Sequence, residues 1–120
     1  MKVKKFIKDF YTSDALYNAD LLEQYIHPEI TLEWYSSKGF LKMKKKDILL
    51  LAHELERNYK MMRTELTHVI KDDNRVSIRY KHYGNTIENP NEEVLLASFM
   101  VIWELKDDKL FYGYQMSQLY

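Results

Sequence analysis

Two histidines are the side chains of this sequence best suited to proton transfer. His68 alternates with Leu66 and Ile70, and His82 alternates with Tyr80, in segments that have the pattern of β-strands. Alternate residues of a strand share one face, and both histidines fall on the more apolar face. Because the reference pKa of histidine is about 6.5, either is a candidate general base if it points inward. The same pattern is typical of a hydrogen-bonded histidine in or beside the core, and that reading stays open for both.

We expect neither a metal nor a cofactor. His68, His82 and Glu33 lie on separate predicted strands without the spacing of a ligand signature, and a zinc site needs at least three converging ligands. The absence of cysteine excludes disulfides, thiolate ligands and a cysteine nucleophile. The sequence holds none of the motifs GxGxxG, GxxxxGKS/T or GxSxG, so nothing supports nucleotide binding or a serine nucleophile elbow.

Charge gives this chain no general attraction to nucleic acid or to anionic membranes. Eighteen basic residues balance eighteen acidic ones in 120 residues. The basic run Lys44–Lys46 lacks neighbouring glycines and interleaved aromatics, and we interpret it as a solvated turn before a helix. No apolar run approaches the roughly 18 residues of a membrane span, and the N-terminal segment lacks the apolar region of a secretory signal. We therefore expect a cytoplasmic protein.

Binding residues are predicted mainly on the segments that flank the charged turn Lys106–Lys109, which joins two strands into a hairpin. Gly113 can leave room for a ligand or mark a bulge. Gln115 and Ser117 share its face and can supply hydrogen bonds. The aromatic candidates for a pocket wall, which could equally be plain core, are Trp34, Tyr80, Phe99 and Trp103. A shift of one residue would exchange the two faces of the last strand.

The elements that would position these residues are helices first and strands afterwards. Apolar residues at helical spacing predict a helix over 3–12, a short helix after Asp20 as its cap that ends at His27-Pro28, and a helix from Ile48 to about Met61 capped by Asp47. Alternation predicts strands over 30–37, 64–70, 75–84, 92–105 and 109–118. The class is α+β, with N-terminal helices on one face of a curved antiparallel sheet, and residues 1–120 form a single domain.

The outer face of the last strand carries Tyr112, Tyr114 and Met116. A sheet face with these side chains is apolar enough to be an interface between two copies of the chain. We therefore expect a homodimer.

The order of elements and four local segments resemble the nuclear transport factor 2-like (NTF2-like) superfamily, which includes the SnoaL-like polyketide cyclases and ketosteroid isomerase. The segments are LLEQYIHPEITLEW, SSKGFLKMKKKDI, DDNRVSIRY and VIWELKDDKLFYGYQ, and the similarity covers nearly the whole chain. The resemblance implies a cone in which the helices and the curved sheet enclose a pocket. It does not fix a function, because this fold carries enzymes, binders and adaptors.

The acids that the resembled enzymes use are missing from this sequence. The isomerase's carboxylate base falls at Trp34 or Tyr35, its tyrosine near Thr12 beside Tyr11, and its second acid near Val101. The cyclases' acid falls in the segment QMSQ, which has none. We therefore expect binding of an apolar or aromatic small molecule without turnover. The alternatives are an isomerase or cyclase with a histidine base, and an interaction module whose own side chains fill the pocket.

Overall fold

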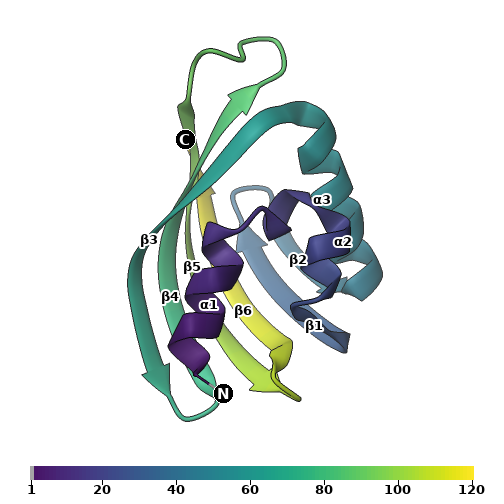
Figure 1. Cartoon of the computed structure of the whole chain (residues 1–120), viewed down its shortest axis with the longest axis vertical. Coiled ribbons are helices and arrows are strands. Elements are labelled where there is room, and N and C mark those ends of the chain that lie inside the picture. The colour runs from purple at the N-terminus through teal and green to yellow at the C-terminus, as the bar shows by residue number, and fades with distance from the viewer. Residues whose placement is uncertain (1) are drawn as a thin grey trace.

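Six strands form one curved sheet that carries three α-helices on one side (Figure 1). This computed structural model describes residues 2–120, and the counts refer to that range. The strand order is β2-β1-β6-β5-β4-β3, with β1 and β6 parallel and every other pair antiparallel. The strands are β1 (Ile26–Ser36), β2 (Gly39–Lys44), β3 (Tyr59–Asp72), β4 (Arg75–Thr86), β5 (Val94–Lys106) and β6 (Lys109–Leu119). The predicted α+β class with a curved sheet is confirmed.

Helix α1 (Val3–Thr12) has the predicted bounds and buries Ile7, Phe10 and Tyr11. A short 3₁₀ turn η1 (Ala15–Tyr17) leads into α2 (Ala19–Glu23). The prediction that Asp20 caps this helix is wrong. Asn18 caps α2, because its side-chain oxygen accepts a hydrogen bond from the backbone N–H of Leu21 at 3.2 Å.

The segment between β1 and α3 (Lys45–Asn58) differs from its prediction. Residues 39–44 form strand β2, which pairs with β1 through a tight turn that places Ser36 opposite Gly39. Gly39 has a φ angle of +112°, a backbone conformation that residues other than glycine rarely adopt. Asp47 lies inside the first turn of α3, where its carboxylate accepts the backbone N–H of Lys44 at 2.9 Å. The helix ends at Asn58, three residues before the predicted end, and strand β3 begins at Tyr59.

Strand β1 also begins earlier than the alternation predicts, so His27 and Pro28 lie in a strand and not in a helix end. His27 is buried. Its Nδ1 accepts the backbone N–H of Glu29 at 2.9 Å, and its Nε2 lies 3.2 Å from Asp107 Oδ2.

The buried core lies between the helices and the inner face of the sheet. Central strands contribute Val76 and Ile78 from β4, Val101 from β5 and Leu110 from β6, all almost fully buried. No helix in residues 2–120 is long and apolar enough to cross a membrane.

Candidate functional site: an apolar cavity

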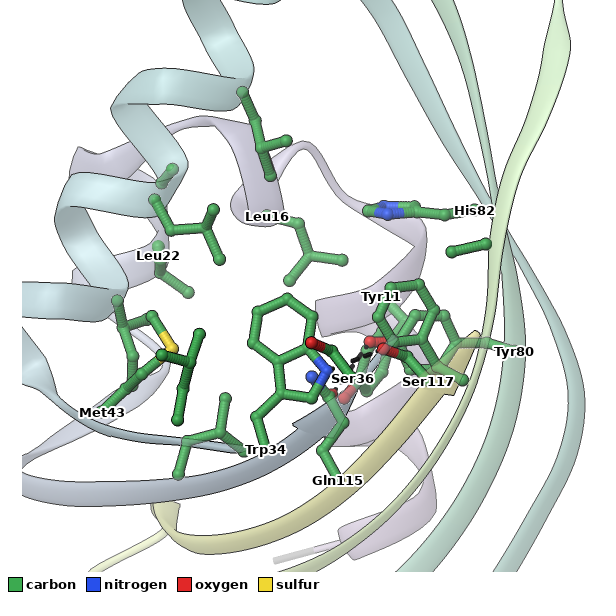
Figure 2. Close-up of a pocket in the computed structure, with 18 of the residues that line it drawn as sticks. Tyr11, Leu16, Leu22, Trp34, Ser36, Met43, Tyr80, His82, Gln115 and Ser117 are labelled. Atoms are coloured by element: carbon green, nitrogen blue, oxygen red, sulfur yellow. Dashed lines mark hydrogen bonds between the residues drawn. The ribbon is translucent and has the colours of Figure 1, made fainter. Parts of the chain in front are cut away.

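A cavity of about 360 Å³ lies between the inner face of the sheet and the helices (Figure 2). Strands β1, β4, β5 and β6 form one wall, and α1, η1, α2 and α3 contribute Tyr11, Leu16, Leu22 and Leu51 among others. Most of the lining is aliphatic or aromatic. Among the described residues that line it, Lys38 is the only one with a full charge, and none is acidic.

The two ends of the cavity differ in exposure. At the inner end, Ile26 and Leu110 face each other across strands β1 and β6, and both are buried beside Trp103. At the other end, Lys38 and Leu119 are exposed to solvent. The cavity therefore opens between the β1–β2 turn and the C-terminal end of β6.

Most polar groups at the inner end form hydrogen bonds with one another. Trp103 Nε1 donates to Tyr11 Oη at 2.8 Å, and Tyr80 Oη donates to Gln115 Oε1 at 3.2 Å. The rings of Tyr11 and Tyr80 lie 4.6 Å apart, and burial raises the pKa of both phenols. Both tyrosines are therefore neutral at physiological pH. The amide nitrogen of Gln115 makes no hydrogen bond to another described residue, which leaves one donor at this wall.

An aromatic wall stands beside this network. Tyr80 and Phe99 are cross-strand neighbours whose rings stack 4.6 Å apart at an angle of 6°. Trp34 lies 6.2 Å from Phe99, and its Nε1 donates to Ser117 Oγ at 2.7 Å. The structure thus brings six of the predicted binding residues to one cavity: Trp34, Tyr80, Phe99, Trp103, Gln115 and Ser117. A ligand-binding role for them remains a prediction.

Gly113 does not line the cavity. A Cβ atom at this position would lie 2.6 Å from Trp103 Cζ3 and 2.8 Å from Leu32 Cδ1. The space above Gly113 is therefore filled by the indole of Trp103. This corrects the expectation that the glycine leaves room for a ligand.

The two candidate histidines lie in different environments in the structure. His82 lines the cavity, is 8% exposed and packs edge-on against Tyr80 and Phe99 at ring distances of 6.1 and 5.7 Å (Figure 2). Burial lowers the pKa of its imidazole to about 4, so His82 is neutral near pH 7.

His68 is exposed on strand β3, which corrects the expectation that it points inward. The pairing register shifts between Leu66 and His68, so the intervening Thr67 is an extra residue in β3. Thr67 Oγ1 donates to the backbone carbonyl of Arg79 at 3.1 Å and accepts from Arg79 Nη1 at 3.0 Å. Beyond this bulge the alternation is reversed. Val69 packs against the core in the place that the sequence pattern assigns to His68.

Sequence reasoning missed several residues of the cavity that come from the helices. The helical spacing places Phe10 and Tyr11 on the apolar face of the first helix but does not assign either of them to a ligand site. That face was the available signal. No pattern pointed to Lys38 or Leu16. Within residues 2–120, no group of three His, Cys, Asp or Glu side chains is placed to hold a metal ion.

Comparisons with known proteins identify the fold. No protein-family model matches the sequence, and no curated protein sequence does either. Solved structures match over almost the whole chain. AusH from Aspergillus nidulans superposes with a TM-score of 0.80 at 10% identity, covering 96% of this chain and 82% of AusH. IdmH, a candidate polyketide cyclase from Streptomyces antibioticus, gives a TM-score of 0.76 at 11% identity, covering 98% of this chain and 92% of IdmH.

A protein with a ketosteroid isomerase-like fold from Catenulispora acidiphila, solved in complex with trimethylamine, gives a TM-score of 0.72 at 10% identity. That match covers 92% of this chain and 82% of the other. This chain therefore has the ketosteroid isomerase-like fold, which it shares with the SnoaL-like polyketide cyclases. The resemblance to the NTF2-like superfamily is confirmed at the level of the fold.

Proposed function

We propose that this protein binds an apolar or aromatic small molecule in the cavity without converting it. The observation that carries this proposal is the cavity itself. Its volume of about 360 Å³ and its apolar lining with a few convergent polar groups are typical of small-molecule sites, which span roughly 300–1,000 Å³. An open volume of this size also argues against the alternative of an interaction module whose own side chains fill the pocket.

The polar groups of the cavity suit orientation of a ligand better than chemistry. The Gln115 amide nitrogen and the Ser117 hydroxyl are neutral, so each can hold a carbonyl or hydroxyl but cannot serve alone as a base. The aromatic wall of Trp34, Tyr80 and Phe99 would bury the remainder of the ligand. No carboxylate belongs to the described lining, and carboxylates are the acids and bases that the resembled enzymes use.

One observation favours a second candidate function, an isomerase or cyclase with His82 as its base. His82 is a neutral imidazole at the cavity wall, in a fold that candidate cyclases and isomerases share. However, burial lowers the pKa of His82, which makes it a weaker base, and no acidic residue of the described lining stands beside it to act as a partner acid. Binding is therefore the primary proposal.

The test is binding of N-phenylnaphthylamine, a neutral aromatic probe whose fluorescence rises in apolar sites. The wild type should bind it saturably. Leu16 projects into the cavity (Figure 2), so Leu16→Trp should fill the space and abolish binding. The matched control is Ile70→Trp, at an exposed site on β3 that does not line the cavity.

Failure of the folded wild type to bind, or equal binding by Leu16→Trp, would contradict the proposal. Turnover of a ligand that is lost in His82→Gln but kept in His68→Gln would favour the enzyme. Both histidine variants should first be shown to fold by circular dichroism.

We further infer that the partner of the outer sheet face is a second copy of this chain. Exposed apolar residues form a continuous band across the three neighbouring strands β5, β6 and β1, since Met100 lies opposite Met116, Ile102 opposite Tyr114, and Met116 opposite Tyr35. Such a band on a monomer is typical of a protein interface. A cytoplasmic location remains our prediction from the sequence.

A further inference from the structure

The geometry points to an amphipathic ligand: an apolar or aromatic body inside the cavity and one anionic group, such as a carboxylate, at its mouth beside Lys38. This inference rests on the proposed function and deepens it by naming the chemical class of the ligand. It follows from the uneven distribution of charge and polar groups between the two ends of the cavity.

The inner end offers no charged partner to an ionised group. Tyr11, Tyr80 and Trp103 hydrogen-bond with one another or with Gln115, the one free donor on Gln115 is a neutral amide, and the surrounding side chains are aliphatic or aromatic. A charged group placed there would lose its water without gaining a charged partner, which is strongly unfavourable. The apolar part of an amphipathic ligand therefore belongs at this end.

The mouth has the opposite character. Lys38 stands in the turn between β1 and β2, and this turn is held against the end of β6 because the backbone N–H of Leu119 donates to Ser37 Oγ at 3.1 Å. The lysine is exposed at the cavity rim, beside the hydroxyl-bearing residue Ser36. A ligand that extends from the inner end would place its polar end here.

Lys38 is also available to a ligand. Among the described residues no carboxylate lies within ion-pair distance of its ammonium group, whereas Lys45 at the start of α3 is held by Glu23 at 2.7 Å. Because Lys38 is the only fully charged residue of the described lining, the charge that the lining presents at the mouth is positive. A positive charge at the mouth favours the binding of an anionic ligand over a cationic ligand that has the same apolar body.

The test compares three probes that share a ten-carbon alkyl chain: decanoate, decanol and decylamine. The affinity of each is measured by displacement of N-phenylnaphthylamine. The Lys38→Gln substitution should weaken the binding of decanoate by roughly two- to fivefold, the range expected for one partly exposed charge pair, and should leave the affinity for decanol unchanged. Lys38→Glu should weaken the binding of decanoate further and strengthen the binding of decylamine. Added salt should weaken decanoate binding to the wild type and have little effect on its binding to Lys38→Gln.

The matched control is Lys42→Gln, which removes the same charge from strand β2 at an exposed position that does not line the cavity. It should leave all three affinities unchanged. Decanoate binding that is indifferent to Lys38→Gln, or equally sensitive to Lys42→Gln, would overturn the anionic class. Binding of N-phenylnaphthylamine without displacement by decanoate would also overturn it while leaving the proposed function standing. Failure of the naphthylamine itself to bind would overturn the proposed function.

Discussion

The buried imidazole of His82 links the cavity to the stability of the protein. Burial lowers its pKa to about 4 in the folded chain, whereas an unfolded histidine titrates at about 6.5. Between these pH values the unfolded state binds one more proton than the folded state. The stabilisation that neutral His82 contributes to the folded state is therefore fully present above about pH 6.5 and is lost as the pH falls towards 4.

We predict that acidification over this range lowers the free energy of unfolding by up to about 3 kcal/mol through His82, and that this residue adds no further loss below pH 4. The measurement is urea unfolding of the wild type and of His82→Gln at pH values from 4 to 7.5. The variant should lack this part of the pH dependence. His68→Gln, at an exposed site, is the control and should behave as the wild type. Parallel curves for wild type and His82→Gln would refute the buried neutral imidazole.

Gly113 gives a second prediction at the residue scale. An alanine Cβ would approach the Trp103 indole to 2.6 Å, so Gly113→Ala should lower the free energy of unfolding by about 1–3 kcal/mol through overpacking. Urea unfolding measures this loss. In a Trp103→Phe background the smaller ring should make the same alanine less costly, which a double-mutant cycle detects. Equal costs in both backgrounds would show that the two residues do not share this space.

At the scale of elements, helix α1 is joined to the sheet by the hydrogen bond from Trp103 Nε1 to Tyr11 Oη. Both side chains are buried, so Tyr11→Phe leaves an indole N–H without its partner. We predict a loss of about 1–3 kcal/mol in the free energy of unfolding, the usual cost of an unpaired buried donor. Removal of both groups in Tyr11→Phe with Trp103→Phe should cost less than the sum of the single changes. Additive losses would mean that the bond does not couple α1 to β5.

Strand β6 carries two different surfaces because its residues alternate between faces. Gln115 points to the cavity and is 6% exposed, whereas its neighbour Met116 is 65% exposed on the outer face. One strand thus contributes both to the proposed ligand site and to the proposed dimer surface. Substitutions on its two faces should therefore separate ligand binding from association.

For the whole molecule, we predict a homodimer through the outer sheet face. Sedimentation equilibrium at micromolar concentration should give twice the 14.6 kDa chain mass. Met116→Lys places a charge in the centre of the apolar band and should shift the protein to the monomer, because an unpaired buried charge is strongly unfavourable in an interface. Ile70→Lys, on an exposed edge strand outside the band, is the control. A wild type that sediments as a monomer would contradict the prediction.

Much of the architecture could be predicted from the sequence because it follows from local patterns. The apolar face of residues 3–12 can be buried only as a helix, and the alternation in residues 75–84 and 109–118 assigns one face of each strand to the core. The same alternation placed Trp34, Gln115 and Ser117 on the inner face, where the structure has them. Strand β2 escaped prediction because most of it is exposed, and only its pairing with β1 makes it a strand.

The remaining features depend on contacts between distant segments. A bulge held by Arg79 turns His68 outwards, although its local pattern matches that of His82. The indole of Trp103 fills the space above Gly113, which no local pattern reveals. The low pKa of His82 and the position of Lys38 at the cavity mouth arise only when helices and sheet enclose a volume. The sequence by itself determined which faces are apolar, because side-chain direction follows from backbone period. Tertiary structure alone decided which spaces stay open and which groups meet in them, because these depend on packing between residues far apart in the chain.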